Sequence, residues 1–252
     1  MKNPSLMPQI AELHQKILEC MGMAIQQKID ALRVTYYIFD TNYRELKDSL
    51  KEYAQPDSSL ALMEEKNRAQ LEQFCAELTR RLHNFLAGAK SLVDHTRNMV
   101  KELYKEHSFL DEYQNKIGDT FAASGVAVFI QELRNYTLHY KLPVAAISMD
   151  MTKLDAGTWE ISNGISLSKE SLKEFSGFTK LAKDYLENSP DQIALAPIVD
   201  QYFSLVTTFY GWLGERQQEV HKAEFGEMNA LQTLLKGLMD QAGIPLVPIE
   251  EV

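Results

Sequence analysis

Apolar residues recur at helical spacing along most of this chain. Between Ile10 and Tyr53 an apolar residue returns every three or four positions, which places one face of an α-helix against a core. Gly22 and the polar stretch 40–42 are the points where this run can break. From Leu60 to Tyr104 the chain contains one glycine, Gly88, and no proline. That stretch predicts one long helix with a bend at Gly88.

The stretch 144–163 is the one part of the chain that alternates like a β-strand. It holds two runs in which apolar and polar residues alternate, on either side of a Leu-Asp-Ala-Gly turn signal. This pattern predicts a two-stranded hairpin. Helical spacing returns after Ser168, whose hydroxyl we expect to cap the next helix.

These patterns predict an all-α fold, a helical bundle with long antiparallel helices and one small β-hairpin insertion. We expect a single helical domain over residues 1–252, because no stretch of the chain reads as a linker. Its expected parts are an N-terminal helical extension (1–55), helices that carry a polar cluster (58–143), the hairpin (144–163) and C-terminal helices with a tail (168–252).

Composition narrows the functional classes. The chain has 252 residues, 45% of them hydrophobic, and a formal net charge of −9. This acidity argues against a broad DNA-binding surface. Cys20 and Cys75 have neither metal-site nor disulfide spacing, which is typical of reduced thiols in a cytoplasmic protein. The N-terminus lacks a signal-peptide pattern, and no apolar run is long enough for a membrane span.

Several chemistries have no motif in this sequence. It contains no Walker loop, no GxGxxG, no HExxH, no GxSxG and no Glu-x-x-His pair. We therefore expect neither a metal nor a cofactor. The remaining candidates are the histidines, of which His14, His83, His107 and His221 are expected to be solvated surface residues.

A polar cluster lies in the stretch "LRNYTLHYKLP", residues 133–143. Asn135 and His139 are four residues apart and share a helix face, whereas Arg134 precedes His139 by five. On a regular helix that separation places Arg134 and His139 about 140° apart. The two can act together if the helix loosens before Pro143, or if a second copy of the cluster faces the first.

A second polar group, Asp94, His95 and Arg97, lies beside the apolar face of the preceding long helix. Asp94 and Arg97 are three residues apart and can pair. One interpretation is a solvated ion pair at the edge of the core. The other is that this helix lends polar residues to a cleft shared with the first cluster.

Arg134, Asn135 and His139 form an Arg-x4-His motif with Asn directly after the Arg, in an all-helical chain. In this the chain resembles the HEPN superfamily (higher eukaryotes and prokaryotes nucleotide-binding). The resemblance covers most of Leu60 to Trp212, including "SLVDHTR" and "YFSLVTTFYGW". It implies metal-independent RNA cleavage by a homodimer, in a toxin–antitoxin, stress-response or phage-defence setting, with a protein antitoxin or regulator as a further partner.

The resemblance also implies residue roles. Arg134 would hold the scissile phosphate, His139 would act as acid or base, and Asn135 would orient His139, with Asp94, His95 and Arg97 as a supporting layer. The chain is longer than compact HEPN toxins, and because it is acidic, RNA would need a local basic region, for which 80–105 is the candidate. The alternative is a non-catalytic interaction module of the same fold. There Arg134 would bond helix-terminal carbonyls and His139 would bond the hairpin.

Overall fold

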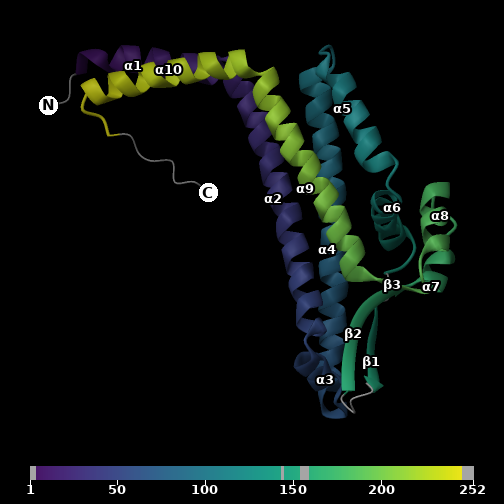
Figure 1. The fold of residues 1–252 in the computed structure, drawn as a ribbon. Coiled ribbons are helices and arrows are strands. Elements are labelled where there is room, and N and C mark those ends of the chain that lie inside the picture. Colours follow the sequence, from purple (N-terminus) through teal and green to yellow (C-terminus); the bar gives the residue numbers. More distant parts are fainter. Residues whose placement is uncertain (1–3, 143–144, 154–158, 246–252) are drawn as a thin grey trace. The chain divides into compact units, whose positions relative to one another are not determined.

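The computed structural model describes residues 4–142, 145–153 and 159–245 (Figure 1). Most of these residues are helical, and a small antiparallel sheet is the other regular element, which confirms the predicted fold class. The contacts divide the chain into two compact units. Unit 1 comprises Met1–Arg33 and Gly211–Val252, and unit 2 comprises Val34–Tyr210.

The bounds of the elements follow. The α-helices are α1 (Met7–Glu19), α2 (Met21–Ala54), α3 (Pro56–Met63), α4 (Arg68–Tyr104), α5 (Phe109–Ile117), α6 (Gly125–His139), α7 (Lys169–Lys173), α8 (Lys180–Asn188), α9 (Leu195–Val220) and α10 (Lys222–Gln241). The tighter or wider turns are η1 (Pro4–Leu6) and η2 (Glu65–Asn67), which are 3₁₀, and η3 (Gly118–Ala122), which is π-helical. The strands are β1 (Ala145–Lys153), β2 (Trp159–Ser168) and β3 (Gln192–Ala194).

In unit 1, α1 packs against α10. The break in the first helical run falls at Cys20, whose backbone is extended between α1 and α2. Gly22 lies inside α2, where a Cβ atom would come within 2.5 Å of the Glu224 carbonyl oxygen on α10. Gly22 therefore permits a close helix approach and is not the break. The predicted break at 40–42 is wrong, because α2 continues through those residues.

In unit 2, α2 runs antiparallel to α4, as their cross-helix contacts show. Thr35 near one end of the pair bonds His95, while Tyr53 at the other end stacks on Phe74. The α9 helix lies beside both in Figure 1. The ring centroids of Tyr202 on α9 and Phe85 on α4 lie 6.1 Å apart. The predicted long antiparallel helices are thus present, and aromatic side chains fill the space between them.

The long helix predicted from Leu60 is divided in the structure. The α3 helix ends at Met63, the η2 turn follows, and α4 begins at Arg68. Gly88 lies within the continuous α4 helix, where a Cβ atom would come within 3.1 Å of the Asn42 side chain on α2. Gly88 therefore marks another close approach of two helices.

The predicted hairpin is part of a larger sheet. β1 pairs with β2, and β2 also pairs with β3, in which Ile193 lies opposite Leu167. Because β3 has only three residues, it offers no alternation that a sequence could reveal. The predicted cap at Ser168 is confirmed, since its hydroxyl accepts a hydrogen bond from the Ser171 amide.

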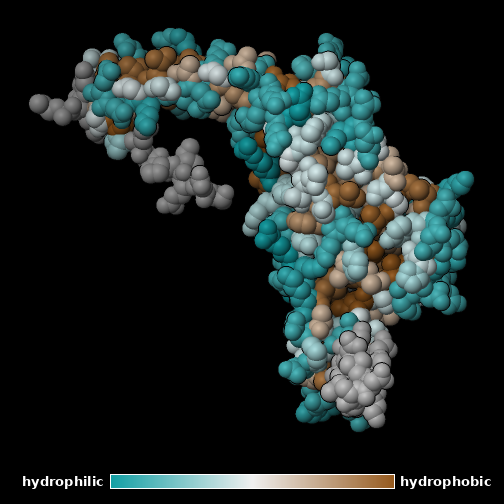
Figure 2. All heavy atoms as spheres, in the orientation of Figure 1, coloured by the Kyte–Doolittle hydropathy of each residue, from teal (hydrophilic) through white to brown (hydrophobic). Residues whose placement is uncertain are grey.

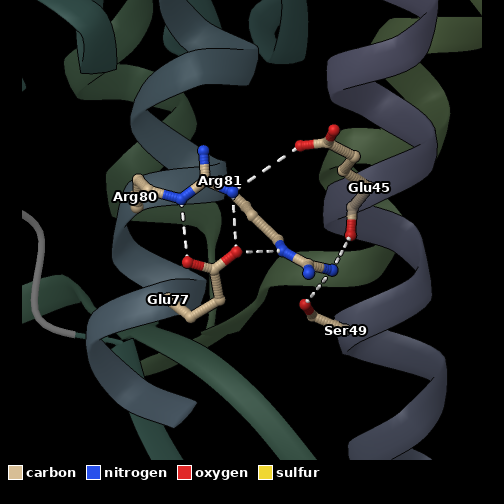
Figure 3. Close-up of polar contacts among 5 residues, drawn as sticks. All are labelled: Glu45, Ser49, Glu77, Arg80 and Arg81. Carbon is tan, nitrogen blue, oxygen red and sulfur yellow. Dashed lines mark hydrogen bonds and ion pairs between the residues drawn. The ribbon is translucent and has the colours of Figure 1, made fainter. Parts of the chain in front are cut away.

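A network of charged side chains joins α2 to α4 (Figure 3). The guanidinium of Arg81 donates to Glu77, to the Glu45 carbonyl oxygen and to the Ser49 hydroxyl, each at 2.8 Å. Arg80 donates to the same Glu77 carboxylate at 2.6 Å. Hydrogen bonds from Arg80 and Arg81 lower the pKa of Glu77 to about 2.

Candidate functional site

The α6 helix carries the Arg134–His139 cluster and is fixed at both ends of its buried face. The Ser124 hydroxyl caps its start by accepting from the Ala127 amide, and Phe129 stacks on Tyr185 of α8 at 5.1 Å between centroids. Near its end, Tyr136 is fully buried, as predicted, and packs against Phe178. The cluster is therefore presented by an anchored helix.

The helix stays regular as far as His139. It unwinds only afterwards, where the amides of Tyr140 and Lys141 both donate to the Tyr136 carbonyl oxygen. The loosening before Pro143 comes too late to turn His139 toward Arg134. Within one chain the two side chains thus leave the helix about 140° apart.

Arg134 and Asn135 are brought together. The Arg134 guanidinium, half-buried, donates to the Asn135 side-chain oxygen at 3.4 Å. Its Nε atom is buried and has no hydrogen-bond partner among the described residues. Asn135 is exposed and contacts Arg134, whereas its predicted contact with His139 is absent from the described contacts.

His139 is exposed, and its ring makes no hydrogen bond with the residues that the structure describes. Its neighbours in the sequence include three exposed apolar side chains. Leu138 is 42% exposed, Tyr140 48% and Leu142 53%. In the region where α6 lies between α9 and α8, Figure 2 also shows apolar surface in brown. Neighbouring exposed apolar side chains of this kind can form a contiguous apolar patch, the type of surface that a partner covers.

The supporting residues on α4 have partners of their own. Asp94 pairs with Lys90, and the predicted pair with Arg97 does not form. His95 bonds the Thr35 hydroxyl through Nδ1 at 2.9 Å. Across the described chain, none of the three bonds the α6 cluster. Arg97 instead lines a cavity.

The basic stretch 80–105 is partly neutralised. Arg80 and Arg81 share the Glu77 carboxylate (Figure 3), and Lys90 is paired as described above. Within the described ranges, Arg97 has no ion pair. The local positive charge available to a polyanion is therefore smaller than the sequence indicates.

A cavity of about 150 Å³ lies within unit 2 and was not predicted. Side chains from α4, α5, η3, α6 and α9 line it, and it is partly open to solvent. Most of its lining is apolar, and Arg97 is the one charged residue among the described residues that form it. The predicted apolar face of α4 gives one wall, but the other walls depend on helix packing that no sequence pattern reports.

No group of three or more His, Cys, Asp or Glu side chains among the described residues is placed to hold a metal ion. None of the described helices combines the length and apolar character that crossing a membrane requires.

Comparison of the chain with family models, curated proteins and solved structures gave no match.

Proposed function

We propose that this protein is a HEPN-like, metal-independent endoribonuclease that acts as a homodimer in the cytoplasm. Arg134, Asn135 and His139 would form the site, which a second copy completes. One observation carries the proposal: His139 is exposed and unbonded among the described residues, at the end of an anchored helix and beside exposed apolar side chains. An imidazole in this position is open to a substrate that approaches from solvent.

The second copy resolves the geometry of the motif. Because Arg134 and His139 diverge on one helix, a two-fold contact would bring Arg134 of one protomer toward His139 of its partner. Leu138, Tyr140 and Leu142 supply apolar surface for that contact. A protein antitoxin or other regulator would act by covering the same surface.

The chemistry needs no metal. The ribose 2′-oxygen attacks the adjacent phosphorus, and its proton passes to a base. The bond from phosphorus to the 5′-oxygen breaks, and that oxygen receives a proton, which leaves a 2′,3′-cyclic phosphate and a 5′-hydroxyl end. A histidine exchanges protons near neutral pH, and an arginine stabilises negative charge on the phosphate oxygens.

The alternative, a non-catalytic interaction module, assigns structural roles to the same residues. In that alternative, Arg134 would donate hydrogen bonds to helix-terminal carbonyl oxygens, and His139 would bond the hairpin. In the described part of the chain, Arg134 bonds only the Asn135 side chain, and His139 bonds neither strand. These contacts favour the enzymatic proposal.

Cleavage of labelled RNA in excess EDTA tests the activity. His139→Ala should lower the rate roughly a hundredfold to ten-thousandfold through loss of proton transfer. Arg134→Ala should lower it roughly a hundredfold or more. His14→Ala, which removes an exposed histidine of unit 1, is the matched control and should leave the rate unchanged. Equal behaviour of all three variants and the native chain would support the interaction module.

Mixing the inactive variants tests the shared site. If Arg134 and His139 act across the two-fold axis, a heterodimer of Arg134→Ala and His139→Ala keeps one complete pair. Random exchange of protomers should then restore about a quarter of native activity. No recovery on mixing, with exchange confirmed by light scattering of differently sized fusions, would contradict a site built from two chains.

A further inference from the structure

The cavity in unit 2 is large enough for one small ring. A protein cavity of about 150 Å³ with apolar walls admits a molecule of benzene size. Its walls include Val93 of α4, Phe121 of η3, and Val206 and Phe209 of α9. These side chains would contact an apolar ligand body on several sides.

Most polar groups in the lining are already bonded within the protein. The hydroxyls of Thr96 and Tyr210 lie within hydrogen-bond distance of each other and of the Leu92 carbonyl oxygen, so their two protons are shared among these contacts. The Gln131 side chain bonds the Tyr202 hydroxyl. A ligand therefore gains little from these groups, because they are not free to turn toward it.

Two donors remain. Tyr113 is only 7% exposed, and its hydroxyl has no hydrogen bond to any described residue. Burial raises the pKa of Tyr113, while the nearby Arg97 charge opposes that rise. The phenol therefore stays protonated, and the positive charge of Arg97 lies near enough to affect its pKa. Arg97 is exposed and unpaired within the described ranges, since its neighbour Asp94 pairs with Lys90.

Arg97 and Tyr113 together offer a positive charge and hydrogen-bond donors to an anion, in the lining of a mostly apolar cavity. The guanidinium is a donor only, and the phenol has one O–H to donate, so together they match a carboxylate. The described lining contains no carboxylate that would repel it. A phosphate would find one cation and no cradle of backbone amides, so a single-charged anion fits better.

We propose that the cavity binds a small monocarboxylate with a compact aromatic or branched apolar body. The body fills the space between α4 and α9, and the carboxylate accepts hydrogen bonds from Arg97 and Tyr113. The π-helical η3 turn forms part of the wall through Phe121 and Ala122, and such turns are frequent at functional sites. This site is independent of the proposed RNA chemistry, because no described bond links it to the α6 cluster.

Calorimetric titration of the full chain with benzoate, and with benzamide as its neutral counterpart, tests the proposal. Benzoate should bind saturably, and benzamide should bind at least roughly tenfold more weakly. Arg97→Gln should weaken benzoate roughly tenfold or more and leave benzamide unchanged. Lys101→Gln, one turn further along α4 and exposed, is the matched control and should change neither affinity.

Two more variants distinguish a loss of ligand binding from a loss of folding. Val93→Phe should fill the cavity and abolish binding of both probes, with its helical circular dichroism retained. If that variant unfolds, Tyr113→Phe keeps the test, since it should weaken benzoate while the cavity stays open. The proposal is overturned by no saturation up to about 10 mM benzoate, by equal affinity for benzamide, or by an Arg97→Gln chain that binds benzoate as the native chain does.

Discussion

Two histidines of unit 2 differ in what they can do because their neighbours differ. His95 commits one ring nitrogen to the Thr35 hydroxyl at 2.9 Å. His139 lies at the end of α6, and none of the described residues bonds its ring. Acid–base catalysis needs a ring nitrogen that can reach the substrate. At the scale of single residues, the proposed acid–base role therefore falls to His139, whereas His95 links two helices.

Gly22 provides a residue-scale test of packing in unit 1. Gly22→Ala should destabilise the fold by about 1–3 kcal/mol, because the added Cβ would lie 2.5 Å from the Glu224 carbonyl oxygen and 2.9 Å from the Met228 Cβ. Gly226→Ala on α10 is the matched control, since its Cβ would meet no atom within 4 Å. It should stabilise the helix by about 0.5–1 kcal/mol. Urea unfolding measures both, and equal stability of the two variants would contradict the close approach.

At the scale of elements, the network around Glu77 should make the α2–α4 contact sensitive to acid. The folded state holds the pKa of Glu77 at about 2, below its ordinary value of 4.5. Its contribution to stability is therefore complete above about pH 4.5 and is lost as the pH falls toward 2. Glu77→Gln should be less stable than the native chain at neutral pH. The difference should shrink across that window.

Thermal unfolding between pH 2 and 7 measures the effect. Glu72→Gln is the matched control on the same helix, because Glu72 makes a single ion pair with Arg68 that is exposed on both sides. Such a pair contributes little, so its removal should change the melting temperature only slightly at any pH. A Glu77→Gln chain with the same pH dependence as the native chain would show that Arg80 and Arg81 do not hold the carboxylate.

The sequence predicts a helix well where its apolar face is continuous. It predicts poorly the boundaries between consecutive elements and the short strands that pair with distant segments. The apolar face of α4 is buried as its period predicts, with Leu82, Phe85 and Leu92 each at most 1% exposed. The start of α4 is not predicted, because no proline or glycine separates it from α3. Likewise β3 depends on pairing with a distant strand. Local spacing reports a helix face, whereas these features follow from contacts made after folding.

The same limit applies to the candidate site. Helical geometry predicts that Arg134 and His139 diverge, and α6 is indeed regular over both. Spacing also predicts an Asp94–Arg97 pair, but Asp94 pairs with Lys90 at i, i−4 instead. Because several partners lie within reach on one helix face, spacing alone does not choose among them. Among the described residues, Arg97 is then left without an ion pair and lines the cavity.

At the scale of the whole molecule, the proposed enzyme requires two chains, so its assembly is the most direct test. Replacing Leu138 and Leu142 together by Lys places charge on the exposed apolar surface beside His139. The double variant should shift from dimer to monomer in light scattering at micromolar concentration and should lose RNA cleavage with it. Leu234→Lys, at a somewhat more exposed position on α10 in unit 1, is the control and should keep both. A native chain that is monomeric yet cleaves RNA would place the complete site within one protomer, and the divergence of Arg134 and His139 would then require α6 to unwind.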